Sequence, residues 1–180
     1  MRITPRRLLG KALELTFNGP VALLPNRVFG GIRPRFLRAI GASVGPRVKI
    51  SRHVKVLGAR SLRLGADVAV ANSVILDARG GLELHEGALI GFDSVILSHT
   101  HAWPDPSRPV HHQGAVSRPV SIGRNVWIGT RVVVLPGASI GDSSVIGASS
   151  VVSGAIPALV VASGNPATVV ADRQDRSAGA

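Results

Sequence analysis

Residues 120–152 read VSIGRNVWIGTRVVVLPGASIGDSSVIGASSVV and carry an aliphatic side chain at every sixth position. The aliphatic positions are Ile122, Ile128, Val134, Ile140, Ile146 and Val152. An α-helix repeats about every 3.6 residues and an ordinary strand every two, so a strict period of six fits neither as one long element. The period predicts short strands that end in turns and stack as a β-solenoid, with three strands to a coil.

A second candidate inward position follows each aliphatic residue by four places. These positions hold Val126, Val132, Ala138, Ser144, Ser150 and Ile156. Space is scarce near the axis of a three-sided prism, so small or branched side chains are expected there. Glycine directly follows four of the aliphatic residues and suits a corner because it has no Cβ. These glycines are Gly123, Gly129, Gly141 and Gly147.

The same register continues earlier in the chain, with a step of eight between coils. The earlier aliphatic positions are Val44, Ile50, Val56, Leu64, Val70, Leu76, Leu84, Ile90 and Ile96. The extra residues fall at 58–60 and 79–81, which we interpret as bulges at one corner. The large gap after Ile96 holds an inserted loop, residues 97–119. The sequence therefore predicts an all-β solenoid of about five coils with one protruding loop.

Three segments are expected along the chain. They are a basic helical N-terminal extension (1–40), the solenoid domain with its inserted loop (41–170) and a flexible tail (171–180). Thr4 and Pro5 favour the start of a first helix. A second, short helix from Pro34 to Ile40 is expected to cap the first coil, because an open solenoid end leaves strand edges unpaired.

The positive charge of the chain is concentrated at its start. The formal net charge is +11, and residues 1–60 hold thirteen Arg or Lys against one Glu, whereas residues 61–180 hold eight against nine acidic residues. A solvated basic face and contact with an anionic membrane both stay open for residues 1–60. We expect no nucleic-acid partner, because aromatic residues are not interleaved with the basic ones.

Two features that the sequence lacks, cysteine and a long apolar run, limit the possible classes of protein. Cysteine is missing, which excludes disulfides and cysteine-based metal sites and suits a reducing compartment. No run reaches the roughly 18–20 apolar residues of a membrane-spanning helix. We therefore expect a cytoplasmic protein, with peripheral contact at the inner face of the membrane as a further option.

The inserted loop is the main departure from regularity and carries four of the six histidines. It begins Ser-His-Thr-His at residues 98–101. Imidazole exchanges protons near neutral pH, so His101 or His99, held at a strand end, is a candidate general base. The alternative is that these are solvated loop histidines without a catalytic role.

The hexapeptide rhythm, the loop at this place, the segment IGRNVWIG at residues 122–129 and the ending Gly-Asn-Pro-Ala at 164–167 together resemble the hexapeptide-repeat acetyltransferases. The subgroup with the greatest similarity is that of the maltose, galactoside and exopolysaccharide O-acetyltransferases. The resemblance covers roughly residues 40–170. It implies a left-handed parallel β-helix that assembles as a homotrimer and binds acetyl-CoA between neighbouring subunits.

The resemblance also implies a catalytic residue. The base of that family opens the protruding loop after Thr or Gly, which corresponds to Thr100-His101, with His99 in reserve. His101 is then expected to remove the proton of a sugar hydroxyl as that hydroxyl attacks the thioester directly. The implied donor is acetyl-CoA, and no metal is expected.

Other site residues follow from the same resemblance. The acetyl-CoA channel corresponds to Trp127, Gly129, Thr130, Gly147, Ala148, Ser153, Gly154, Asn165 and Pro166. Asn72 resembles an acceptor-binding Asn, with a corner residue bonded to backbone as the alternative. The family often has Thr-Lys-Asp where this chain has Ser153-Gly154-Ala155, so a lysine near the phosphates is absent, and Arg131 or Arg173 is its candidate replacement.

The loop is rich in proline and in basic residues. Trp103, Asp105 and Arg108 are expected to contact the acceptor, which is a sugar or a glycoconjugate. The basic residues are Arg108, His111, His112 and Arg118, and they are compatible with an acceptor that bears carboxylate or phosphate. No residue separates the acceptor classes further.

Two other functions compete with acetyl transfer. A zinc enzyme similar to the γ-type carbonic anhydrases shares the solenoid fold, and His85, His99, His101 and His111 would supply its imidazoles. A non-catalytic trimeric scaffold is the second.

Overall fold

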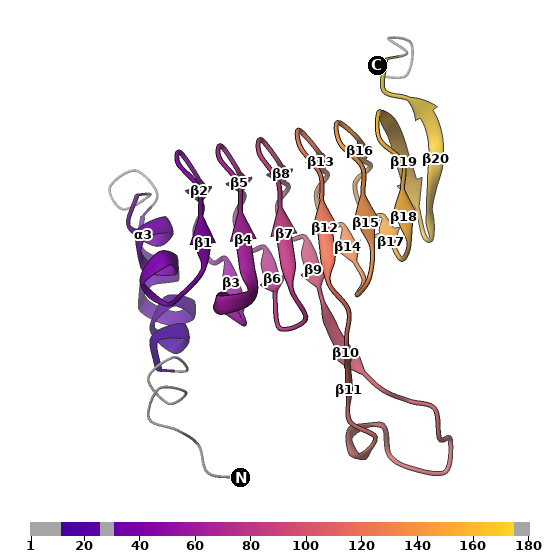
Figure 1. Ribbon diagram of the computed structural model, residues 1–180, viewed down its shortest axis with the longest axis horizontal. Coiled ribbons are helices and arrows are strands. Elements are labelled where there is room, and N and C mark those ends of the chain that lie inside the picture. The colour runs from indigo at the N-terminus through magenta and orange to yellow at the C-terminus, as the bar shows by residue number, and fades with distance from the viewer. Residues whose placement is uncertain (1–11, 26–30, 175–180) are drawn as a thin grey trace.

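The computed structural model describes residues 12–25 and 31–174, and most of them form a three-sided solenoid. Figure 1 shows its coils stacked along the long axis of the molecule, with helices at the N-terminal end and a hairpin that leaves the body. Each side is a parallel sheet, extended on one side by an antiparallel last strand. We call the three sides faces A, B and C, in the order in which the chain visits them.

The strands of each face are short. Face A contains β1 (Ser43–Val44), β4 (Leu62–Leu64), β7 (Leu82–Leu84), β12 (Val120–Ile122), β15 (Ser139–Ile140) and β18 (Ala155–Ile156). Face B contains β2 (Lys49–Ile50), β5 (Ala69–Val70), β8 (Leu89–Ile90), β13 (Trp127–Ile128), β16 (Val145–Ile146), β19 (Val160–Gly164) and β20 (Ala167–Asp172). Face C contains β3 (Lys55–Leu57), β6 (Ile75–Asp77), β9 (Val95–Leu97), β14 (Val133–Val134) and β17 (Val151–Val152).

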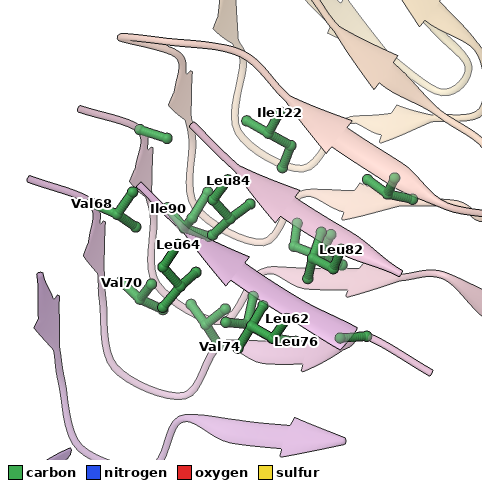
Figure 2. Packing of buried hydrophobic residues seen from close by; sticks show 14 of the residues in the cluster. Leu62, Leu64, Val68, Val70, Val74, Leu76, Leu82, Leu84, Ile90 and Ile122 are labelled. Atoms are coloured by element: carbon green, nitrogen blue, oxygen red, sulfur yellow. The ribbon is translucent and has the colours of Figure 1, made fainter. Parts of the chain in front are cut away.

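The register predicted from the sequence is confirmed. On face A, Leu64 pairs with Leu84, and Leu84 with Ile122, across neighbouring coils. These side chains are buried in a stack along the axis (Figure 2). The second inward positions from Val126 to Ser150 are also buried. A continuous buried column, mostly apolar, thus replaces the single core that an isolated coil is too small to form.

The corners correct one expectation about glycine. The residues with left-handed φ at the corners include Asp67 (59°), Asn125 (52°) and Arg131 (58°), so glycine is not required for the bend. Gly129 is required by the neighbouring coil, because a Cβ there would lie 2.8 Å from the backbone nitrogen of Ala148. The stacking distance between coils, rather than the turn, selects glycine after the aliphatic residue.

The eight-residue steps lie at one corner, between faces C and A. The first forms a 3₁₀ turn, η2 (Ala59–Ser61), and the second a turn at residues 79–80, closed by a hydrogen bond from the Gly81 N–H to the carbonyl of Ala78. Both segments leave the three-sided core undisturbed, as the bulge interpretation predicted.

A sixth, incomplete coil follows the five that the period indicated. Ile156, expected at a second inward position, instead pairs with Ile140 as the leading aliphatic residue of β18. Ala162 continues the stack above Ile146, and β20 returns antiparallel to β19. Strand β20 includes Ala171 and Asp172, which were expected in the flexible tail; residues 175–180 lie outside the described residues.

Helices close the first coil. Residues 12–23 are helical, with a kink at Gly19 inside the segment η1 (Phe17–Val21). Helix α3 (Ile32–Ala39) starts two residues before the expected Pro34. Phe17 and Leu37 are buried with the core. Asn18 exchanges two 2.8 Å hydrogen bonds with the backbone of Val56, which satisfies part of the open strand edge. The helix start expected at Thr4 and Pro5 lies outside the described residues.

One arginine ties this cap together. Arg33 is fully buried and donates hydrogen bonds to the carbonyl oxygens of Val21, Leu24 and Ile50. Burial, and secondarily the charge of Arg52, lowers the pKa of its guanidinium. Within residues 12–25 and 31–174, no helix has the length and apolar character needed to cross a membrane.

Candidate active site

The inserted loop forms a β-hairpin whose root is fixed to the solenoid. Strands β10 (His99–His101) and β11 (Ala115–Ser117) pair antiparallel, and the tip contains a 3₁₀ turn, η3 (Val110–His112). At the root, Ser98 Oγ donates to the carbonyl of Asp77 (2.6 Å) and accepts from the backbone N–H of Gly80 (2.8 Å). The hairpin therefore leaves corner C/A from a rigid base (Figure 1).

The two candidate bases lie two residues apart on β10 and differ in surroundings. His99 is half-buried, and its Nδ1 lies 3.0 Å from Ser117 Oγ on the paired strand. His101 is exposed and pairs with Ala115, whose methyl group leaves the imidazole accessible. His101, and not His99, lines the pocket at the inner side of the hairpin.

That pocket has a volume of about 580 Å³ and lies between the hairpin and the turns that follow β14 and β17. Its lining residues are Thr100, His101, Ala102, Trp103, Pro104, Val116, Arg118, Leu135, Pro136 and Ser153. It brings together three of the predicted site residues, namely His101, Trp103 and Ser153. The mixture of one imidazole, two hydroxyls, one guanidinium and apolar walls fits a small polar ligand.

Two residues expected to bind the acceptor are engaged within the loop. The carboxylate of Asp105 accepts hydrogen bonds from Ser107 Oγ (2.6 Å) and from the Ser107 backbone N–H, which lower the pKa of Asp105. Arg108 Nη2 donates to the carbonyl of His112. Neither Asp105 nor Arg108 lines the pocket, and both shape the tip instead.

Most of the residues assigned to the acetyl-CoA channel lie elsewhere on the protomer. Trp127 projects from face B with about half of its side chain exposed. Thr130 and Ala148 are exposed where β13 and β16 turn toward face C, next to Gly129 and Gly147. Asn165 and Pro166 connect β19 to β20. These residues occupy face B and corner B/C, one full width of face C from His101.

Asn72 belongs to the same distant group. It lies at corner B/C before β6, and its Oδ1 accepts a hydrogen bond from the backbone N–H of Arg52 (3.1 Å). Of the two arginines considered for the phosphates, Arg131 stands at this corner beside Thr130. Arg173 instead donates to the carbonyl of Asn125 at corner A/B.

The structure adds an ion pair between a buried carboxylate and a half-exposed arginine, to which the sequence interpretation assigned no role. Asp77, 1% exposed, binds Arg79 through Nε to Oδ1 (2.9 Å) and Nη2 to Oδ2 (2.6 Å). Burial acts to raise the pKa of the Asp77 carboxyl, but the hydrogen bonds and charge of Arg79, with His99, hold it below its ordinary value. The sequence signal that could have revealed this pair is a carboxylate at a strand position that is otherwise apolar, two residues before an arginine.

The histidines do not assemble as metal ligands. His85 lies on the other side of the prism, with Nε2 3.4 Å from Ser121 Oγ, while His99 and His101 are on the hairpin. Across the described ranges 12–25 and 31–174, no three side chains of His, Cys, Asp or Glu gather as a metal site.

Comparison with known proteins identifies the class to which this solenoid and hairpin belong. Residues 119–154 match the family model of the bacterial transferase hexapeptide (six repeats). Galactoside O-acetyltransferase of Escherichia coli K12 is 34% identical over 177 residues, covering 95% of this chain and 81% of that protein. The chain therefore belongs to the hexapeptide-repeat acetyltransferases, and its solenoid is a left-handed β-helix.

Solved structures show the same relationship. Galactoside acetyltransferase in complex with coenzyme A superposes with a TM-score of 0.82 at 30% identity, over 96% of this chain and 83% of that one. A maltose O-acetyltransferase from Clostridium difficile 630 gives a TM-score of 0.79 at 28% identity, over 94% of this chain and 87% of that one. The resemblance noted from the sequence is thus confirmed.

Proposed function

We propose that the protein transfers the acetyl group of acetyl-CoA to a hydroxyl of a sugar or glycoconjugate, with His101 as general base. The similarity to galactoside and maltose O-acetyltransferases supports the reaction. The observation that carries the assignment of the base is the position of His101, on a hairpin with a fixed root and open to a pocket with apolar walls.

The residues suggest a direct transfer. Imidazole of His101 takes the hydroxyl proton as the sugar oxygen bonds to the acetyl carbon, the C–S bond breaks, and the proton passes to the departing thiolate of coenzyme A. No acyl-enzyme is needed. Trp103 and Leu135 give the pocket apolar walls beside His101.

The active site is proposed to combine two copies of the chain. His101 and the group around Trp127 and Thr130 lie on opposite sides of face C, so one protomer cannot bring them to one substrate. The outward row of face C starts with the exposed Lys55 in the first coil and is apolar and half-buried from the second coil onward, with Ile75, Val95, Val133 and Val151. The outward row of face B includes Leu89, Trp127, Val145 and Val161, whereas that of face A includes Ser43, Arg63, Glu83, Ser121 and Ser139.

This contrast favours packing of face C of one copy against face B of the next. A head-to-tail contact of this kind closes into a ring, here a homotrimer, if the rotation is a third of a turn. The proposed ring places the hairpin of one copy beside Trp127 of its neighbour.

The test is acetyl transfer from acetyl-CoA to methyl galactoside, measured by thiol release and by the mass of the product. The wild-type protein should acetylate the sugar, and His101→Ala should lower kcat by roughly a hundredfold or more while coenzyme A binding persists. His111→Ala, at the hairpin tip and outside the pocket, is the matched control. Unchanged turnover in His101→Ala would exclude His101 as the base.

A further inference from the structure

Arg118 is the one pocket residue with a permanent charge. It follows β11 directly, and its backbone N–H donates to the carbonyl of Ser98 (2.9 Å), so its main chain shares the fixed root of the hairpin. Its aliphatic stem lies over Gly137, where an added Cβ would come within 3.2 Å of Arg118 Cδ. The guanidinium is thus carried by a stem that lies against the solenoid, at the root of the hairpin.

The charge of Arg118 has no protein partner among residues 12–25 and 31–174. The ion pairs described in this part of the chain are Arg47 with Asp67 and Arg79 with Asp77. No Asp or Glu lines the pocket. Arg108, the other arginine of the loop, differs because its Nη2 is bound to the carbonyl of His112.

Arg118 is exposed, so its guanidinium is accessible to a ligand that enters the pocket. Trp103, Pro104, Val116, Leu135 and Pro136 give the pocket an apolar lining beside that charge. A guanidinium binds planar carboxylate and phosphate groups through two parallel hydrogen bonds. A neutral sugar has no anionic group to form this paired hydrogen bond with the guanidinium.

We propose that Arg118 selects acceptors that carry a carboxylate or phosphate group, so that the substrate class is anionic sugars or glycoconjugates. This inference rests on the proposed acetyl transfer, because it places the anion beside the hydroxyl that His101 deprotonates. Arg118 is a specificity-determining residue in this scheme and takes no part in proton transfer. The phosphates of coenzyme A are the other source of the same chemistry, and the experiment separates the two.

The test compares galactose 1-phosphate and galacturonate with methyl galactoside, in the wild-type protein, Arg118→Ala and Arg118→Lys. The control is Arg124→Ala, which removes an exposed arginine at corner A/B, outside the pocket. We expect the wild-type kcat/KM to favour the anionic sugars by roughly tenfold or more. Arg118→Ala should bring that ratio close to one, Arg118→Lys should retain part of it, and Arg124→Ala should keep it. The KM for acetyl-CoA should stay unchanged in Arg118→Ala.

A direct measurement of sugar binding tests the role of Arg118 independently of the acetyl-transfer reaction. Calorimetry without donor should detect the anionic sugars in the wild-type protein and a loss of at least tenfold in affinity in Arg118→Ala. Equal turnover of neutral and anionic sugars, or a preference that survives in Arg118→Ala, would overturn the proposal. A higher KM for acetyl-CoA with an unchanged acceptor ratio would assign Arg118 to the donor and also overturn it. Anion binding without any acetyl transfer would instead count against the proposed function alone.

Discussion

Arg79 binds the carboxylate of Asp77 through two nitrogen atoms at the point where the hairpin leaves the solenoid. The pair is asymmetric, because the side chain of Asp77 is 2% exposed and that of Arg79 is 49% exposed. The carbonyl of Asp77 also accepts the hydroxyl of Ser98, so the pair is part of the root that positions β10.

Loss of Arg79 should therefore destabilise the fold more than loss of the Asp77 charge. In Arg79→Ala a buried carboxylate loses its partner, which costs about 3 kcal/mol. In Asp77→Asn the remaining guanidinium is solvated, and the cost is about 1–2 kcal/mol. Urea denaturation of both variants at pH 7 measures the two values, and the reverse order would contradict the asymmetry.

The same Asp77–Arg79 pair predicts that the free energy of unfolding depends on pH. The pKa of Asp77 is lower in the folded protein than its ordinary value, so its stabilisation is present above about pH 4, the unfolded pKa, and is lost as the pH falls through the lowered folded pKa. The difference in unfolding free energy between the wild-type protein and Asp77→Asn should be constant from pH 7 to pH 5 and shrink below pH 4. A difference that grows on acidification would contradict this assignment.

Gly80 should be intolerant of a side chain. A Cβ there would clash with the carbonyl oxygen of Ser98 and displace the base of the hairpin. We expect Gly80→Ala to cost about 1–3 kcal/mol and to lower acetyl transfer, because a displacement of about 1 Å at a base can reduce the rate by roughly a hundredfold. Gly31→Ala is the control, since a Cβ at Gly31 meets nothing within 4 Å. Wild-type activity in Gly80→Ala would show that the root tolerates the shift.

His99 should act through the hairpin and not on the substrate. Its Nδ1 lies 3.0 Å from Ser117 Oγ, which ties the two strands together. His99→Ala and Ser117→Ala should therefore give similar, moderate losses of activity, and the double variant should lose no more than either. The Arg118 acceptor preference should weaken in parallel, because β11 leads into Arg118. A loss in His99→Ala as large as that in His101→Ala would transfer the role of base to His99.

Faces B and C should form the contact between copies. Val133→Lys places a charge in the apolar outward row of face C, and we expect it to dissociate the oligomer and to abolish activity without unfolding the solenoid. Ser139→Lys, at the equivalent outward position of face A, should leave assembly intact. Light scattering after size exclusion measures both, and a dissociated Ser139→Lys with an intact Val133→Lys would place the contact on the other face.

The sequence by itself determined the coil, because its period is local. Each aliphatic side chain packs against the equivalent side chains in the coils directly above and below it. Leu64, Leu84 and Ile122 could therefore be assigned to one stack from their spacing alone. The position of the loop and the presence of His101 in it followed from the same register.

Only the tertiary structure decided which loop residues face the pocket. The side chains of Asp105 and Arg108 are engaged within the tip, whereas Arg118 points into the pocket because Ser98 and Gly137 hold its backbone and stem. The two contacts of Arg118 join residues 20 and 19 positions apart, and no repeat in the sequence marks them. The sixth coil was hidden for a related reason: a step of four from Val152 to Ile156 breaks the period, and only pairing with Ile140 restores the register.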